Sequence, residues 1–170
     1  MDFVSIPASE INDSVFHLIG SDWMLLSAGT EESFNTMTAS WGAFGVLWKK
    51  NTATVYIRPL RYTCRFFHEN TFFSMCFFDE EHRKDLNYIG SHSGRDENKL
   101  ASTALTPIFL HSPQAPIFEQ AKLAVICKKL YEDCFRSECF ADSSPIADCY
   151  PQLDFHRFFI GEISEVLVRR

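Results

Sequence analysis

The sequence lacks the short motifs that identify several large enzyme classes. Its seven glycines never form the G-x-G-x-x-G of a dinucleotide-binding Rossmann fold, and the phosphate loop G-x-x-x-x-G-K-[ST] is also missing. Neither G-x-S-x-G, the nucleophile turn of α/β-hydrolases, nor H-E-x-x-H, the zinc-protease motif, occurs. Chemistry that depends on these common motifs is therefore excluded.

Long apolar runs and an excess of positive charge are also missing. No stretch approaches the ~18 apolar residues that cross a bilayer, and the densest, Thr71–Phe78 and Ala121–Cys127, have the length of strands. The first residues, with Asp2 and Glu10, do not resemble a signal peptide. With 22 acidic and 16 basic residues the net charge is -6, which disfavours nucleic acid as a partner. We expect a soluble, cytoplasmic protein that binds neither nucleic acid nor membrane.

Six cysteines are present, but no two are spaced C-x-x-C, so the thioredoxin motif and the usual zinc knuckle are absent. Without an export signal, reduced thiols are the expectation. Cys134, Cys139, Cys149 and His156 are of zinc-ligand type, yet their gaps of four, nine and six residues match no familiar zinc site. We therefore expect core or surface thiols and no metal site.

The composition suits one folded domain over residues 1–170, because 46% of the residues are hydrophobic and 15% are aromatic. Stretches rich in β-branched and aromatic residues predict strands, and they outnumber helical patterns. The predicted strands are Trp23–Ala28, Thr36–Ser40, Gly45–Lys49, Thr52–Arg58, Phe72–Phe78, Ala104–Leu110, Lys122–Phe135 and Phe155–Arg169.

Helical spacing of apolar residues is confined to a few segments. These are Pro7–Ile19, Tyr62–Glu69, Glu80–Ile89 and the short Asn98–Ser102, while the proline-bearing stretches His111–Pro116 and Ser143–Pro151 separate the later strands. Because strand and helix do not alternate regularly, we predict a mainly β fold, an antiparallel barrel with a few peripheral helices.

Three polar clusters interrupt the apolar stretches. In the first, Asn35–Trp41, short hydroxyl side chains and a small alanine permit close approach of a ligand to the backbone, whose amides and carbonyls can bond the edge of a heterocycle. An ordinary edge strand with its Thr and Ser side chains in water would have the same pattern.

The second cluster, Arg58–Thr63, has the outline of a phosphate site. Arg58 and Arg61 carry permanent forked positive charge, and Thr63 stands at the start of a predicted helix, where free amides favour anions. Both arginines could equally pair with surface carboxylates.

The third cluster, Ser93–Lys99, combines a turn at Gly94 with the charges of Arg95 and Lys99. A solvated loop would look similar, and Asp96 could instead cap the next helix.

Taken in order along the chain, these clusters resemble the flavin reductase-like, FMN-binding split-barrel family. The resemblance rests on Asn35–Trp41, Ile57–Thr63, Ser93–Asp96 with Lys99, and His156 ahead of Ile160–Ile163. It implies an antiparallel split β-barrel, bound FMN, and a homodimer in which each FMN lies near the subunit interface. The segment between Leu105 and Tyr150 resembles the family less distinctly.

Carried over position by position, the resemblance implies three groups of FMN-binding residues. Thr38, Ala39 and Ser40 would border the ring or ribityl chain, with Met37 and Trp41 shaping the pocket. Arg61 and Thr63 would hold the phosphate, with Tyr62 beside them and Arg58 either contributing or supporting the loop. Ser93, Gly94, Arg95, Asp96 and Lys99 would close over the flavin. His156 either faces a nicotinamide or makes a structural hydrogen bond, so its catalytic role stays open.

The function that follows is an FMN-containing oxidoreductase that moves electrons from NAD(P)H through flavin to free flavin or another acceptor. Such a reaction needs no catalytic triad, because the cofactor carries the chemistry. A flavoredoxin-like electron carrier reduced by a protein partner, and a non-catalytic flavin- or haem-binding module, are the alternatives. The 17 phenylalanines exceed what a small barrel interior readily holds, which also favours a homodimer.

Overall fold

A computed structural model describes residues 3–170 and shows one large antiparallel sheet. Seven strands follow the order β3-β2-β6-β9-β10-β5-β4, and β1 pairs with the far end of β10. Their bounds are β1 Phe3–Ile6, β2 Met24–Gly29, β3 Phe34–Ala39, β4 Gly42–Leu47, β5 Lys50–Ile57, β6 Phe72–Phe77, β9 Leu123–Cys134 and β10 Arg157–Arg169. A separate hairpin pairs β7, Pro107–His111, with β8, Gln114–Phe118.

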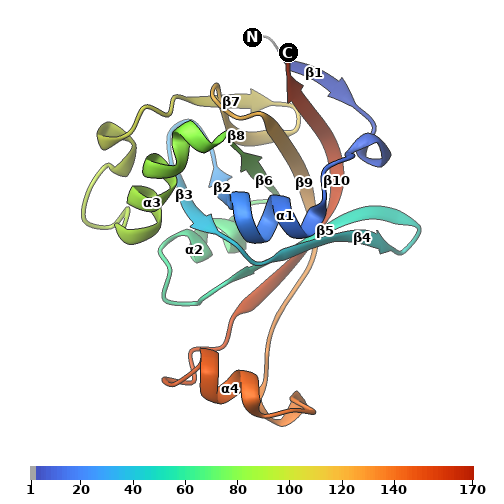
Figure 1. Cartoon of the computed structure of the whole chain (residues 1–170), viewed down its shortest axis with the longest axis vertical. Coiled ribbons are helices and arrows are strands. Elements are labelled where there is room, and N and C mark those ends of the chain that lie inside the picture. Colours follow the sequence, from blue (N-terminus) through green and yellow to red (C-terminus); the bar gives the residue numbers. More distant parts are fainter. Residues whose placement is uncertain (1–2) are drawn as a thin grey trace.

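The two edge strands of this order, β3 and β4, are joined by only Ser40 and Trp41. Because the three Cα–Cα steps from Ala39 to Gly42 span no more than ~11 Å, the sheet curls until these ends of its two edge strands lie close together. This is the predicted split barrel, and the seam between β3 and β4 marks its opening (Figure 1).

The helices are short and lie outside the sheet, as predicted. They are α1 Val15–His17, α2 Thr63–Glu69, α3 Arg83–Ser91 and α4 Ser144–Cys149, with one-turn segments η1 Ala8–Glu10, η2 Leu18–Asp22, η3 Glu80–His82, η4 Lys99–Ser102 and η5 Ser137–Cys139. No helix within residues 3–170 has the length and apolar character needed to span a membrane.

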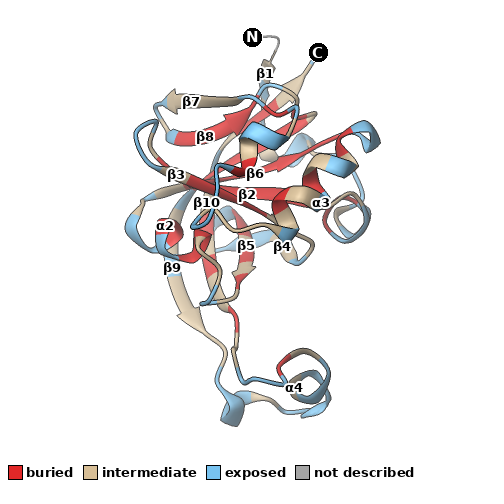
Figure 2. Cartoon of the chain, turned by 90° about the vertical axis from the view of Figure 1, so that its left-hand side faces the viewer, coloured by how far each residue is buried: buried red, intermediate tan, exposed pale blue. Residues whose placement is uncertain are grey.

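Two apolar clusters bury both faces of the central strands (Figure 2). Successive side chains of a strand point to opposite faces, so Leu26 of β2 joins Phe67 and Phe159 in the barrel interior. Its neighbour Leu25 joins Phe118 in a second core between the sheet and the β7–β8 hairpin. Strand β2 is buried along its whole length for this reason.

The amino-terminal helix predicted over Pro7–Ile19 is wrong. Residues 8–10 form a single 3-10 turn, the chain is extended at Ile11, and α1 begins only at Val15. The intervening Asn12, Asp13 and Ser14 are residues whose side chains compete for backbone hydrogen bonds, which disfavours a helix interior. Beyond Gly20 the chain continues helical as η2 to Asp22 instead of ending.

Three further predictions need correction. The strand predicted over Gly45–Lys49 runs from Gly42 to Leu47, because Trp48 and Lys49 turn the hairpin with φ of 52° and 60°. The strand predicted from Ala104 begins at Pro107. The stretch His111–Pro116, expected to separate strands, instead contains most of β8, and β1 was not predicted.

Between β9 and β10 the chain leaves the sheet and forms a projecting arm, residues 135–156, which carries η5 and α4 (Figure 1). The arm is largely exposed, in contrast to the sheet (Figure 2). A backbone bond from Phe135 N–H to the His156 carbonyl, 3.0 Å long, closes its base. The stretch Ser143–Pro151, expected only as a separator, supplies the arm's helix α4.

Candidate functional site

A cavity of about 240 Å³ opens at the seam of the barrel. The turn from β3 to β4 forms one side, and the ends of β5 and α3 and the base of the arm form the rest. Its lining residues are Met37, Thr38, Ala39, Ser40, Trp41, Tyr56, Arg58, Arg61, Gly90 and His156.

A second cavity, of about 290 Å³, adjoins the first at Arg61, which lines both. It lies between the start of α2 and the loop that follows α3. It is lined by Asn35, Leu60, Arg61, Tyr62, Thr63, Ser91, His92, Ser93, Gly94, Arg95, Asp96 and Lys99.

All fourteen FMN-binding residues predicted from the sequence line one or the other of these cavities. The fold thus brings together three clusters that lie far apart in the chain. Sequence reasoning named Asn35 and Leu60 without giving them a role, and it missed the lining residues Tyr56, Gly90, Ser91 and His92. No sequence motif surrounds Tyr56 or Gly90, and they reach the lining of the first cavity only because the sheet curls.

Arg61 lies where the two cavities meet, and its side chain is hydrogen-bonded to α3. Both terminal nitrogens of its guanidinium donate to the carbonyl of Gly90, each at 3.1 Å. Burial lowers the pKa of Arg61, but a guanidinium titrates so far above neutrality that the side chain keeps its charge.

Lys99 is almost fully buried behind Arg61. Its ammonium donates to the carbonyls of Thr36, at 2.6 Å, and Ile89, at 3.3 Å. Burial first, and then the neighbouring charge of Arg61, lower the pKa of Lys99 to about 8. The lysine therefore still carries a proton on most molecules at pH 7.

Positive charge accumulates at the second cavity, whose lining holds Arg61, Arg95 and Lys99 but only one carboxylate, that of Asp96. Across residues 3–170, neither Arg61, Arg95 nor Lys99 has a carboxylate oxygen within 4.0 Å. Arg95 instead lies over the ring of Tyr62, 5.4 Å from its centre. Three cations around a hollow that an anion can enter are typical of a phosphate site.

Asn35 and Gly94 shape the wall of the same cavity. The Asn35 side-chain amide donates to the Thr63 hydroxyl at 2.8 Å, which ties β3 to the start of α2. A Cβ on Gly94 would lie 2.3 Å from the Asn35 side-chain oxygen, so only glycine lets the loop approach this closely.

Arg58 differs from Arg61, because a carboxylate already binds it. Its guanidinium donates to Asp154 at 2.5 Å and to the Cys149 carbonyl at 2.7 Å, both in the arm. The hydrogen bond from Arg58 lowers the pKa of Asp154, which keeps the pair ionic. Of the two roles predicted for Arg58, the structure favours support of the loop.

His156 forms part of the wall of the first cavity. The rings of Trp41 and His156 are 4.9 Å apart, and the Tyr150 hydroxyl lies 2.9 Å from His156 Nδ1. Burial, and then the charge of Arg58, lower the pKa of His156 to about 4, so the imidazole is neutral at pH 7. Of the two alternatives that the sequence left open for His156, the structural hydrogen bond is present.

The cysteines show no pairing or metal cluster in the described part of the chain. All six are free, and Cys76 and Cys127 are fully buried. Within residues 3–170 no group of three or more His, Cys, Asp or Glu side chains is placed to hold a metal ion.

Comparison with known proteins places this geometry in one family. The family profile described as "Flavin reductase like domain" matches residues 16–170. None of the curated proteins compared with the sequence matches it.

Solved structures share the fold at low sequence identity. A flavoredoxin from Methanosarcina acetivorans is 22% identical with a TM-score of 0.64, over 85% of this chain and 67% of that one. An FMN-binding domain of a flavin reductases-like enzyme from Shewanella baltica is 16% identical with a TM-score of 0.71, over 98% and 77%. An FMN-binding protein from Thermus thermophilus, solved with bound 1-cyclohex-2-enone, is 23% identical with a TM-score of 0.65, over 96% and 79%. The chain belongs to the flavin reductase-like family, as the polar clusters of its sequence predicted.

Proposed function

We propose that the chain binds FMN across the two adjoining cavities, with the phosphate in the second and the flavin ring in the first. The observation that carries this proposal is the cluster of Arg61, Arg95 and Lys99 around the second cavity, none of which has a carboxylate oxygen within 4.0 Å among residues 3–170. A buried ammonium and a half-buried guanidinium are costly to desolvate, and an anionic ligand offsets that cost. The residues present therefore fit a phosphorylated cofactor.

The proposed roles divide along the seam. Arg61, Thr63 and Lys99 hold the phosphate, and Ser93–Asp96 close over it. The segment Met37–Trp41 borders the ring and ribityl chain. Trp41 is 43% exposed, so an aromatic surface remains available beside the ring.

We further propose that the protein is an oxidoreductase that takes electrons from NAD(P)H and passes them to free flavin or another acceptor. Bound FMN would supply the hydride and electron transfer. The chain's own residues hold the phosphate, exclude water at the seam and set the electrostatics. His156 contributes a neutral ring at pH 7, not a charge, because its pKa is about 4.

Homodimerisation and a cytoplasmic location are also part of the proposal. Large apolar side chains are exposed on this chain, among them Val46, Trp48, Leu60 and Leu153, and Leu60 borders the second cavity. A second copy that covers Leu60 would lie near the proposed FMN phosphate. Six free thiols suit a reducing compartment.

The first experiment is to purify the protein without added flavin, record its visible spectrum and identify any released chromophore by chromatography. We expect a yellow protein that releases FMN, or a colourless one that takes up FMN stoichiometrically on titration. A colourless protein that fails to bind FMN would remove the proposal.

The loaded protein then distinguishes an enzyme from a carrier. Steady-state oxidation of NADH or NADPH at a rate far above that of free FMN is expected. Reduction of the bound FMN by a donor protein, with no turnover of either nicotinamide, would show that the protein is an electron carrier and not an enzyme. The proposal that it binds FMN would stand.

Lys99 makes FMN affinity depend on pH. Because the pKa of Lys99 is about 8 and phosphate binds the charged form, affinity is expected to fall about tenfold between pH 7 and pH 9. Lys99→Met is expected to remove this pH dependence and to weaken binding at pH 7 roughly tenfold. Fluorescence titration measures both, and riboflavin, which has no phosphate, should show neither effect.

The lowered pKa of Lys99 affects folding stability in the opposite direction to FMN affinity, so stability rises with pH. The folded-state pKa of Lys99 lies below its unfolded value, so between pH 8 and about 10.4 the unfolded chain binds more protons. The contribution of Lys99 to the free energy of unfolding therefore rises over this window.

An FMN affinity that is flat from pH 7 to 9 in the wild type would contradict the role given to Lys99.

A further inference from the structure

An apolar groove of about 720 Å³ adjoins the first cavity, and Ser40, Trp41 and Tyr56 line both. This volume lies in the range of about 300–1,000 Å³ typical of small-molecule sites. The other lining residues come from the α1–η2 segment, β4 and the arm. They are Val15, Phe16, Ile19, Gly20, Gly42, Ala43, Phe44, Phe135 and Tyr150.

None of the groove's lining residues is charged. Burial raises the pKa of Tyr150, so its hydroxyl also stays neutral at physiological pH. An anionic ligand would lose its hydration here without a cation to pair with, which costs free energy. An uncharged ring gains free energy instead, because its apolar surface is removed from water. The chemistry of the groove is thus opposite to that of the second cavity.

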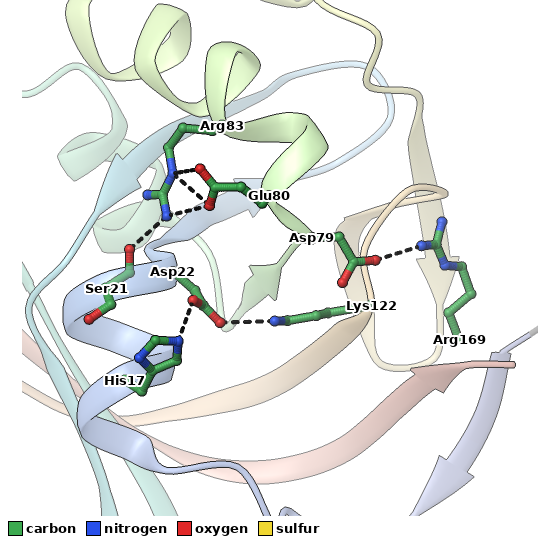
Figure 3. Close-up of polar contacts among 8 residues, drawn as sticks. All are labelled: His17, Ser21, Asp22, Asp79, Glu80, Arg83, Lys122 and Arg169. Carbon is green, nitrogen blue, oxygen red and sulfur yellow. Dashed lines mark hydrogen bonds and ion pairs between the residues drawn. The ribbon is translucent and has the colours of Figure 1, made fainter.

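One wall of the groove is the α1–η2 segment, which a polar network holds in place (Figure 3). The Asp22 carboxylate lies 3.1 Å from His17 Nε2 and accepts a hydrogen bond from Lys122 Nζ at 2.9 Å. Arg83 donates to the Ser21 carbonyl at 2.8 Å and also pairs with Glu80. The segment that presents Val15 and Ile19 is therefore anchored to α3 and to Lys122, the residue before β9.

The arm supplies the opposite wall. Phe135 stacks on Tyr56 with ring centres 5.7 Å apart and an angle of 26° between the planes. The Arg58 guanidinium lies 5.4 Å from the centre of the Tyr150 ring and binds the adjacent Cys149 carbonyl. Both walls are thus fastened to the barrel, and the groove is formed in the single chain.

We propose that this groove binds a small, uncharged aromatic or conjugated ring compound, which would lie directly beside the first cavity. That the compound is a substrate rests on the proposed flavin function, but its binding does not. Continuity with the first cavity through Trp41 and Tyr56, the volume and the neutral lining support such a ligand.

Two probes of equal size and different charge test the site. Isothermal titration of the full, FMN-loaded chain is made with 2-acetylnaphthalene, which is neutral, and with 2-naphthoate, its anionic counterpart. We expect the ketone to bind at least tenfold more tightly than the carboxylate. Equal affinity for the two probes, or no binding of the ketone, would overturn the proposal.

Ala43 offers a variant that changes the groove alone. It is exposed, lines the groove and does not line either cavity of the FMN site. Ala43→Glu places a carboxylate in the groove and is expected to weaken 2-acetylnaphthalene binding about tenfold or more. Val46→Glu is the matched control, since Val46 lies on the same strand, is 75% exposed and does not line the groove.

Two further measurements separate the outcomes. FMN affinity, measured for each protein, is expected to stay within twofold of the wild type, so failure of the ketone to bind a protein that holds FMN overturns the groove alone. Sedimentation at the same concentrations gives the mass. A loss of ketone binding at unchanged mass supports the proposal, whereas a dimer that Ala43→Glu dissociates would show that a second copy occupies the groove.

Discussion

Arg61→Ala is expected to weaken FMN binding roughly 30- to 150-fold, which corresponds to about 2–3 kcal/mol for a charge-assisted contact with phosphate. Arg61 is the residue common to both cavities, and no carboxylate among residues 3–170 neutralises it. Its loss also frees the Gly90 carbonyl, which it binds through two nitrogens. Titration of flavin fluorescence at low salt measures the change.

Arg65→Ala is the matched control for charge. Arg65 lies one turn along α2, is exposed, and rests over the rings of Tyr62 and Phe66 without lining either FMN cavity. Its removal lowers the net charge equally and should change FMN affinity less than threefold. If Arg61→Ala weakened riboflavin as much as FMN, the phosphate role of Arg61 would be refuted.

Gly161→Ala is expected to destabilise the fold by about 2–3 kcal/mol, because a side chain at this position overpacks the barrel interior. A Cβ there would lie 2.7 Å from the Cβ of Cys127 and 2.7 Å from the ring of Phe73. Both neighbours are fully or almost fully buried, so neither has space to move away. For a chain of this size the midpoint of thermal unfolding should fall by about 5–10 °C.

Gly45→Ala tests whether the effect comes from packing and not from glycine in a strand. Gly45 lies in β4 opposite Thr52, and no atom lies within 4 Å of a Cβ built there. The variant should unfold at the wild-type temperature or slightly above it, because alanine restricts the unfolded chain. A Gly161→Ala protein as stable as Gly45→Ala would mean that the strands shift to admit the methyl group.

The central strands were predictable from the sequence because a run of apolar residues indicates a buried strand even when the strands it pairs with are unknown. Strands β2, β6 and β9 are buried on one or both faces, and their apolar runs signal this directly. The family resemblance added the curl of the sheet and the nearness of three distant clusters, and both are confirmed. That these residues contact FMN remains a prediction.

The elements that were missed depend on distant contacts. Strand β1 has four residues and exists through its pairing with the end of β10, 160 to 166 positions away. In β8, Pro116 interrupts the strand signal, yet it pairs opposite Phe109 in a two-stranded hairpin whose outer side needs no donor. The turn at Trp48 and Lys49 was missed because both residues have positive φ without the usual glycine or asparagine.

The arm, residues 135–156, can vary in length without disturbing the barrel, and it forms one wall of the apolar groove. Its base is closed by one backbone bond, and its return to the barrel is set by Arg58 and the stacking of Phe135 on Tyr56. Doubling the length of a flexible loop costs only about 0.6 kcal/mol in closure entropy. Residues inserted near the tip, around η5 and α4, would leave the register of β9 and β10 unchanged. The wall formed by Phe135 and Tyr150 is thus a place where grafted segments can alter which molecules enter, while the flavin end of the barrel keeps its shape.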